Sequence, residues 1–310
     1  MEFKHYSVML KETVDGLAVK AGGVYADGTL GGGGHSYEIL SRAENVRLIG
    51  IDRDADALAA AKKRLCGFDG QVTYVHDNFS NINAVLDGLG IDKIDGMVLD
   101  LGVSSYQLDN AERGFSYMHD APLDMRMNRD VKMTAYDVVN GYSEDELTEI
   151  FYNYGEEKWS RRIAQFIVDK RKIKPVSTTF ELTELVKAAI PQGARKDVAH
   201  PEKRVFQAVR IEVNGELKIL DGAICDIVGR LNTGGRLSVI TFHSLEDRIV
   251  KQAFASLAKG CTCPPDFPVC VCGGKPKIKV ITRKPILPPD AELAENSRSK
   301  SAKLRICERL

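Results

Sequence analysis

The segment Asp27-Gly-Thr-Leu-Gly-Gly-Gly-Gly-His-Ser36 decides how this chain is interpreted. It lies between a β-like run, Gly23-Val-Tyr-Ala26, and an amphipathic stretch that begins near His35, so it predicts a strand, a loop and a helix in that order. Glycines lack the Cβ atoms that would keep a ligand away from the backbone, and they adopt positive φ angles without strain. The helix after such a loop presents unpaired N–H groups and the positive end of its dipole. The segment therefore predicts a nucleotide-binding loop.

The spacing of the glycines bears on which kind of nucleotide the loop binds, and it disfavours a dinucleotide. Dinucleotide-binding loops have the pattern Gly-x-Gly-x-x-Gly, whereas the residues from Gly31 onward place Ser36 in the last position. A second β-like run, Arg47-Leu-Ile-Gly-Ile51, is followed by Asp52. This carboxylate lies about 20 residues beyond the glycines, where it can accept hydrogen bonds from ribose hydroxyls. The pattern indicates a ribose-containing ligand but departs from a typical NAD site.

The size and composition are those of a globular protein. The 310 residues, of which 44% are hydrophobic, suffice for one large domain or for a domain with an insertion. There is no apolar run of about 18 residues and no apolar N-terminal stretch typical of a signal peptide, so we expect a cytoplasmic protein without membrane contact. Because 43 basic residues balance 43 acidic ones, a nucleic-acid partner must be bound by local basic patches.

One such patch lies near the middle of the chain. Between residues 158 and 174 there are seven basic residues and one acidic residue. The best candidates for contacts with an RNA backbone are Lys158, Arg161, Arg162 and Arg171. A solvated helix face is the alternative explanation of the same charges.

Four of the seven cysteines form a cluster, in two Cys-x-Cys pairs: Cys261, Cys263, Cys270 and Cys272. Four thiolates at this spacing are able to complete a tetrahedral zinc site, but a proline-rich loop with reduced cysteines accounts for the same residues. We expect the three isolated cysteines to be small buried hydrophobic residues. These are Cys66, Cys225 and Cys307.

The first hundred residues alternate between strand and helix patterns. We expect a helix over Ala55–Leu65 and strands over Gln71–His76 and Ile94–Asp100. Repeated steps from strand to helix predict an α/β fold with a mostly parallel, doubly wound sheet. Ligands of such sheets lie at the carboxyl ends of the strands. The candidates at these ends are the glycine loop, Asp52, Phe79 and Asp100.

The next convincing strand, Gly235–Phe242, comes more than 100 residues later, which is too long a gap for one crossover. The intervening residues are helix-like, and one helix opens with a capping box from Ser143 to Glu146. We therefore predict a discontinuous sheet domain and an inserted helical domain for substrate recognition. The sheet domain comprises residues 1–105 and 213–310, and the insertion comprises residues 106–212.

Two further expectations concern the C-terminal part of the sheet domain. Ser244 and Asp247 follow the strand and match the acid form of a capping box. Residues Lys303–Arg309 alternate between polar and apolar side chains, as an edge strand does.

Seven motifs together resemble one family closely. They are Asp27–Ser36, Gly50–Asp54, Asp100–Asp109, Ala111–Ser116, Pro122–Arg126, Phe206–Ile211 and Phe242–Arg248. In this order they are similar to the bacterial S-adenosylmethionine-dependent methyltransferases that modify N4 of a decoding-site cytidine in 16S ribosomal RNA. The resemblance implies a Rossmann-like class I methyltransferase fold, S-adenosylmethionine as cofactor, and 16S rRNA within the small ribosomal subunit as partner. The sequence leaves open whether the protein forms a homodimer.

The resemblance also implies roles for single residues. Those that would hold the methionine end of the cofactor are Gly32, Gly33, Gly34 and His35. Asp52 would take the ribose, and Phe79 would pack near the adenine. Asp100 and Gln107 would face the cavity in which the methyl group is transferred.

The expected chemistry is direct, in-line transfer to nitrogen. The lone pair of the cytosine amine is shared with the ring, so the enzyme must position the amine and hydrogen-bond to it. We expect Asp100 to accept a hydrogen bond from the amine, assisted by Ser104, Ser105 or backbone carbonyls. Methylation at carbon 5 would need a cysteine nucleophile near the fourth strand, and the sequence has none there. This chemistry requires no metal.

Two other functions remain open at this stage. The same sheet supports an NAD-dependent oxidoreductase, although the glycine spacing disfavours it. A non-enzymatic RNA-binding assembly factor with a vestigial cofactor site is the second alternative, and the intact Gly33, Asp52 and Asp100 argue against it.

Overall fold

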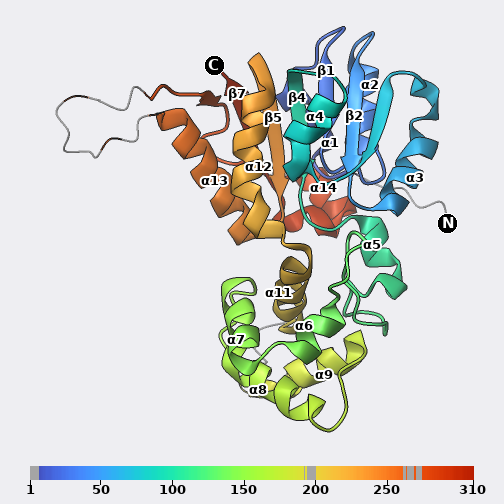
Figure 1. The fold of residues 1–310 in the computed structure, drawn as a ribbon, viewed down its shortest axis with the longest axis vertical. Helices are drawn as coiled ribbons and strands as arrows, with labels where there is room; N and C mark the ends of the chain where they lie inside the picture. Colours follow the sequence, from blue (N-terminus) through green and yellow to red (C-terminus); the bar gives the residue numbers. More distant parts are fainter. Residues whose placement is uncertain (1–6, 192, 194–199, 261–262, 264–268, 270–273) are drawn as a thin grey trace. The chain divides into compact units, whose positions relative to one another are not determined.

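The computed structural model describes residues 7–191, 193, 200–260, 263, 269 and 274–310 (Figure 1). The chain divides into two compact units, which are described separately. The sheet unit comprises Met1–Gly102 and Leu217–Leu310, and the helical unit comprises Val103–Glu216. The divisions fall at residues 102 and 216, against the expected 105 and 212.

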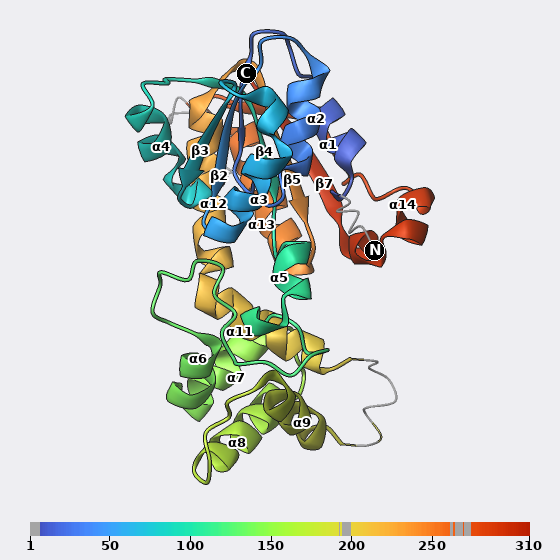
Figure 2. The ribbon, with the colours of Figure 1, turned by 90° about the vertical axis from the view of Figure 1, so that its right-hand side faces the viewer.

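The sheet unit contains a seven-stranded sheet in the order β3-β2-β1-β4-β5-β7-β6 (Figures 1 and 2). The strands are β1 (Val24–Asp27), β2 (Arg47–Asp52), β3 (Val72–His76), β4 (Ile94–Asp100), β5 (Leu231–Thr241), β6 (Ile278–Val280) and β7 (Lys303–Arg309). Strands β1 to β5 pair in parallel, and β7 runs antiparallel between β5 and β6. This arrangement is the Rossmann-like class I methyltransferase fold, so the predicted fold class is confirmed.

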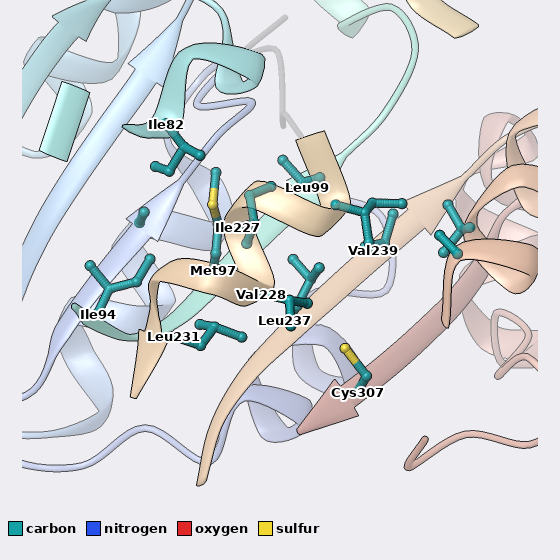
Figure 3. Close-up of a cluster of buried hydrophobic side chains, with 14 of the residues drawn as sticks. Ile82, Ile94, Met97, Leu99, Ile227, Val228, Leu231, Leu237, Val239 and Cys307 are labelled. Carbon is teal, nitrogen blue, oxygen red and sulfur yellow. The ribbon is translucent and has the colours of Figure 1, made fainter. Parts of the chain in front are cut away.

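Helices cover both faces of this sheet. They are α1 (Leu10–Leu17), α2 (Gly34–Arg42), α3 (Ala55–Arg64), α4 (Ile82–Gly88), α12 (Glu216–Arg230), α13 (Ser244–Lys259) and α14 (Asp290–Glu295). Met97 and Leu99 of β4 pack in the cluster formed with α4, α12 and α13 (Figure 3), whereas Val98 packs with α1, α2 and α3. Because successive strand residues point to opposite faces, a strand covered on both sides is apolar throughout. This explains why the consecutive residues Met97, Val98 and Leu99 of β4 are all apolar.

Two predicted strands differ from the observed ones. The segment Lys303–Arg309 is not an edge strand, because β7 pairs with β5 on one side and with β6 on the other. The true edge, β6, has three residues, which is too short for an alternating pattern to be recognised. Strand β5 begins at Leu231, before the expected Gly235, and its register with β4 is irregular between Ile94 and Gly96.

The isolated cysteines do not all lie in the core. Cys307 is buried as expected, but the prediction is wrong for Cys66 and Cys225, which are exposed. Helix α12 buries Leu220 and Ile224, and Cys225 lies on the helix surface that these two residues leave outside. Cys66 begins a short 3₁₀ turn, Cys66–Phe68, without buried residues.

One expected capping box is confirmed and the other is wrong. The Ser143 hydroxyl accepts from the Glu146 backbone N–H, and the Glu146 carboxylate accepts from the Ser143 N–H. At the start of α13 the cap is His243 rather than Ser244, and its partner is Glu246. The helix starts there because the Glu246 carboxylate accepts from the backbone N–H groups of Phe242 and His243, at 2.8 and 3.3 Å.

The helical unit has a core of its own. Its helices are α5 (Ser105–Asp109), α6 (Ala135–Gly141), α7 (Glu144–Asn153), α8 (Ser160–Arg171), α9 (Thr179–Ala189) and α11 (Glu202–Asn214). Apolar side chains of the helices α6 to α11 pack in one cluster with residues of the loop before α6. Such a cluster is what an amphipathic helix needs to remain folded in water.

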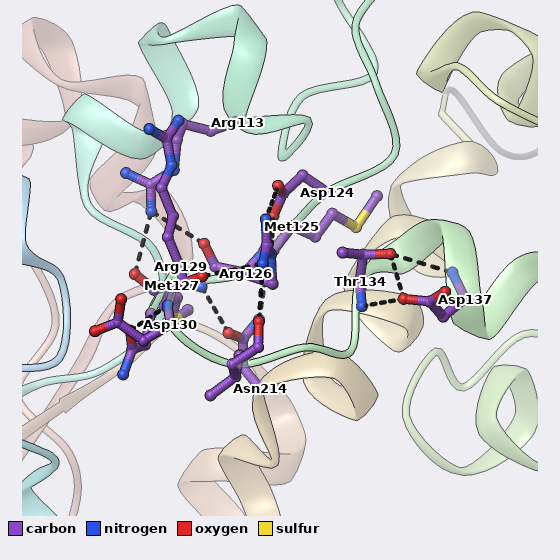
Figure 4. A network of polar contacts seen from close by, with 12 residues as sticks. Arg113, Asp124, Met125, Arg126, Met127, Arg129, Asp130, Thr134, Asp137 and Asn214 are labelled. Carbon is purple, nitrogen blue, oxygen red and sulfur yellow. Dashed lines mark hydrogen bonds and ion pairs between the residues drawn. The ribbon is translucent and has the colours of Figure 1, made fainter.

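A polar network fixes the loop before α6 (Figure 4). The Arg113 side chain is fully buried, and its guanidinium donates to the backbone carbonyls of Arg126 and Met127, at 3.0 and 3.2 Å. At the end of α11, the Asn214 amide donates to the Met125 carbonyl and accepts from the Met127 N–H. Met125 has a positive φ of 57°, a strained conformation for a methionine. The network therefore stabilises the turn at Met125, although the backbone conformation of that residue is unfavourable.

Among the described residues, no helix combines the length and the apolar character that crossing a membrane requires.

Candidate functional site

The glycine loop after β1 lies against the ends of β2 and β4. The Gly28 N–H donates to the Val98 carbonyl at 3.0 Å, and the Leu30 N–H donates to the Ile51 carbonyl at 3.1 Å. A Cβ atom on Gly28 would lie 2.5 Å from Cε of Met97, so only glycine fits there. Gly33 has a φ of +74° and precedes α2 as its N-cap. The loop thus brings the start of α2 to the carboxyl end of β1, as predicted for a nucleotide site.

Asp27, the last residue of β1, is a buried carboxyl group that the sequence analysis did not assign to the site. It is 1% exposed and accepts from the Ser36 hydroxyl at 2.7 Å and from the Thr29 N–H at 3.2 Å. Burial raises the pKa of Asp27 from 3.8 to about 6, and the two hydrogen bonds oppose this rise. The signal was available, because Asp27 ends its strand as Asp52 and Asp100 end theirs.

The raised pKa of Asp27 predicts a pH-dependent stability. A folded-state pKa above the unfolded value favours the protonated carboxyl, so its contribution is present below about pH 3.8 and is lost as the pH rises through about 6. We expect the difference in unfolding free energy between the wild type and Asp27→Asn to fall by roughly 2 kcal/mol from about pH 4 to about pH 7. Denaturant titrations followed by circular dichroism measure it, and other titrating groups cancel in the difference. Parallel pH profiles would contradict the assignment.

Asp52 holds the glycine loop from the end of β2. One carboxylate oxygen accepts from the Gly31 N–H and the other from the Asp54 N–H, each at 2.8 Å. Burial raises the pKa of Asp52, while these two hydrogen bonds lower it. Phe79, after β3, lies beside the loop, because a Cβ on Gly28 would come within 2.9 Å of the Phe79 Cβ. The structure therefore brings together the two residues expected to hold the ribose and the adenine.

Asp100 ends β4 next to the buried His35 of α2. The His35 Nε2 lies 3.0 Å from the Val8 carbonyl, so Nε2 carries the proton and Nδ1 is bare. This Nδ1 lies 3.8 Å from the Asp100 carboxyl. Burial lowers the pKa of His35 to about 4, which keeps the ring neutral near pH 7. His35 is 5% exposed and lies next to Asp100, and its contact with the cofactor stays a prediction.

Further carboxyl groups surround Asp100. Burial raises the pKa of Asp100 well above its usual value, and the charges of Asp27, Glu246 and Glu292 raise it further. Glu246 belongs to α13 and Glu292 to α14, which lies at the same edge of the sheet (Figure 1). The Asp100 Oδ1 is buried, and within the part of the chain that the structure describes it has no hydrogen-bond partner. A cationic ligand fits this set of groups, because it would compensate several buried negative charges.

The other two predicted catalytic residues, Ser104 and Ser105, belong to the helical unit. They lie at the start of α5. Ser104 caps α5, its hydroxyl accepts from the Gln107 N–H, and the Gln107 side chain accepts from the Ser104 N–H at 3.0 Å. Ser105 is the first residue of α5 and is half-buried. A capping box explains Ser104 and Gln107 structurally. Their roles in methyl transfer remain predictions.

The predicted RNA-binding residues differ in their exposure to solvent. Lys158, Arg161 and Arg162 are exposed, and the Arg162 guanidinium lies 5.5 Å from the centre of the Phe166 ring. Arg171 instead donates to the Val139 carbonyl at 2.8 Å, linking α8 to α6. Three of the four predicted residues are therefore exposed, and their contact with RNA stays a prediction.

The predicted zinc cluster is not tested. Cys261, Cys270 and Cys272 lie outside the described residues, although Cys263 lies within them. Within the described part of the chain, no group of three or more His, Cys, Asp or Glu residues is arranged to hold a metal ion.

Comparison with known proteins gives similarities over the whole chain. A model of the MraW methylase family matches residues 2–310. A Clostridium botulinum protein named ribosomal RNA small subunit methyltransferase H is 61% identical over 311 residues, which cover 100% of each chain. A Lachnospira eligens protein of the same name is 59% identical and covers 100% of this chain and 99% of its own. Among solved structures, a putative rRNA-methylase from Clostridium thermocellum has 13% identity and a TM-score of 0.46, covering 98% of this chain and 99% of that chain.

Proposed function

Because the chain belongs to the MraW methylase family, we propose that it methylates the N4 amine of a cytidine in 16S rRNA, using S-adenosylmethionine. Family membership makes it a methyltransferase and removes the oxidoreductase and assembly-factor alternatives. The relatives' names, which specify the small ribosomal subunit, support the RNA substrate. The observation that carries the site is the convergence of Asp27, Asp52 and Asp100 at adjacent strand ends around the glycine loop.

The acidic strand ends suit this methyl donor. S-adenosylmethionine supplies an electrophilic methyl group on a positively charged sulfur when bound. Asp27 and Asp100 would offset that charge, and the Asp52 carboxylate offers the acceptor oxygens that ribose hydroxyls need. An uncharged or anionic ligand would leave the buried carboxylates without compensation.

Asp100 is our candidate for the group that handles the target amine. In its ionised form it accepts a hydrogen bond from the amine and draws the nitrogen lone pair out of the ring. When the nitrogen–carbon bond forms, the methyl–sulfur bond of the donor would break with its electron pair left on sulfur, and the amine would become cationic and would have to lose a proton. A carboxylate whose pKa is raised by burial is a stronger base, so Asp100 also accepts this proton. The bare Nδ1 of His35 faces Asp100 and limits the orientations of its carboxyl.

Nucleoside analysis tests the function. Small subunits from a strain without this gene are incubated with the protein and S-adenosylmethionine, and nucleosides from the 16S rRNA are separated and weighed by mass spectrometry. We expect N4-methylcytidine to appear. Transfer only to protein-free RNA would contradict the particle as substrate, and 5-methylcytidine would contradict transfer to nitrogen.

The exposed basic residues of α8 predict a salt-dependent effect on RNA binding. Arg161 and Arg162 are exposed, and Arg161 has only one distant ion pair, 3.9 Å from Glu144. If each neutralises one phosphate, Arg161→Glu with Arg162→Glu lowers the slope of log affinity against log salt by about 1.5. Filter binding over a range of salt concentrations measures the slope. Lys63 is exposed on α3, and reversing its charge in Lys63→Glu is the control that should leave the slope unchanged. If the wild type and both variants give equal slopes, α8 does not contact the RNA.

A further inference from the structure

An aromatic cluster in the helical unit has no place in the site described above. The Tyr117 ring meets the Phe206 ring edge to face, with centroids 5.8 Å apart. The second neighbour of Tyr117 is His200. The centroids of these two rings lie 5.7 Å apart, and the angle between their planes is 34°. Phe206 is buried, whereas the His200 side chain is 58% exposed. Tyr117 thus has one aromatic neighbour that is buried in the core and another that reaches solvent.

A buried carboxylate lies beside this pair. Glu202 is the first residue of α11 and is 4% exposed. Its Oε1 lies 3.2 Å from the His200 Nδ1, but its Oε2 is buried and has no hydrogen-bond partner among the described residues. Position at a helix start favours the negative charge of Glu202. An unused oxygen on a buried carboxylate nevertheless costs free energy, because it has lost its water without gaining a donor.

We propose that Tyr117, His200 and Glu202 bind an unstacked RNA base that carries an exocyclic amine, namely cytosine or adenine. The base stacks on the Tyr117 ring, and its amine donates to the Glu202 Oε2. Single-stranded RNA is commonly recognised by this combination of aromatic stacking and hydrogen bonds to the base edge. The proposal rests on the proposed function, since it takes RNA as the substrate.

The carboxylate selects among the four bases. An amine of cytosine or adenine donates to a carboxylate oxygen, as glutamate does with cytosine N4 in nucleic-acid complexes. Uracil presents carbonyl oxygens on both sides of its N–H, and these repel the carboxylate. Guanine presents two adjacent donors and is best matched by two free oxygens, whereas Oε1 is taken by His200.

Entry of the base requires a movement of His200. The Oε2 atom has almost no exposed surface while the His200 ring lies over Tyr117. His200 is more than half exposed, so its ring can change rotamer at little cost. Next to it, Lys203 is exposed and Arg204 is partly exposed, which places positive charge where the phosphates of the same strand would pass.

Binding of two short RNA probes tests the proposal. Fluorescence anisotropy compares oligouridine with the same strand carrying one cytidine, using the full-length protein. We expect the wild type to prefer the cytidine strand about tenfold, the effect of one hydrogen bond to a charged group. Glu202→Gln keeps the shape and an acceptor for His200 but presents an N–H₂ group, so the preference should disappear or turn toward uridine.

A second pair of variants separates stacking from hydrogen bonding. Tyr117→Leu should weaken both probes about tenfold, whereas Tyr117→Phe should not. Tyr136→Leu, a 40% exposed tyrosine on α6, is the matched control and should bind as the wild type does. Thermal unfolding of each variant identifies any loss of the fold.

The outcomes distinguish this site from the function on which it rests. If folded Glu202→Gln discriminates between the probes as the wild type does, the base site is wrong. If the wild type shows no preference for the cytidine strand yet methylates small subunits, the site is again wrong while the function stands. If the wild type neither binds RNA nor transfers a methyl group to it, the proposed function itself fails.

Discussion

Asp100→Ala is expected to slow methyl transfer by about a hundredfold to a thousandfold while the cofactor still binds. The loss follows because the target amine is then without the acceptor that localises its lone pair and takes its proton. Single-turnover transfer of a labelled methyl group to small subunits measures the rate. Isothermal titration with S-adenosylhomocysteine measures binding independently of chemistry.

Two further variants make this test specific. Asp100→Asn keeps the size and one acceptor oxygen but loses the charge and the basicity, so we expect an intermediate rate. Asp95 lies near the opposite end of the same strand, where its carboxylate accepts from the Val24 N–H at 2.8 Å. The control variant Asp95→Asn should therefore transfer the methyl group at the wild-type rate. A rate for Asp100→Ala within tenfold of the wild type, with the cofactor bound, would remove Asp100 from the chemistry.

Arg113→Met is expected to lower the unfolding free energy of the helical unit by about 3 kcal/mol. Methionine fills part of the volume, but the carbonyls of Arg126 and Met127 lose the donors that satisfy them inside the core. The turn at Met125, with its positive φ, would lose one of its two anchors. A loss of this size is large beside the total stability of a domain.

The single tryptophan of the chain allows this loss to be measured in the correct unit. Trp159 packs against the core of the helical unit, so its fluorescence in a denaturant titration follows that core alone. Arg129→Met changes an exposed arginine of the same loop, which is drawn in Figure 4, and should stay within about 0.5 kcal/mol of the wild type. Equal midpoints for Arg113→Met and Arg129→Met would show that the buried guanidinium is dispensable.

The sheet could be predicted because its signals are local. Glycines after β1 and an acid at the end of β2 each depend on a few neighbouring residues, and the rule that parallel strands align their carboxyl ends places them together. The edge strand β6 could not be predicted, because three residues carry no period. The start of α13 was misplaced by one residue, because a histidine side chain replaces the usual serine as the cap.

The acidic residues around Asp100 could not be predicted from the sequence, for a different reason. Glu246 and Glu292 lie far from Asp100 along the chain, and although Glu246 belongs to the motif Phe242–Arg248, that motif does not indicate a contact with Asp100. The contact of His35 with the Val8 carbonyl, which fixes its tautomer and leaves the bare nitrogen facing Asp100, could not be predicted either. Tertiary contacts of this kind are visible only after folding, because no local propensity encodes them.

The bond between Glu292 and the Met9 backbone N–H joins positions 283 residues apart. Together with β7, which is inserted between β5 and β6, it means that the sheet is incomplete until residue 309 has been synthesised. The contact of Glu292 with Met9, and the charge that Glu292 places near Asp100, therefore form only when the first and last segments of the sheet unit have come together in the fold.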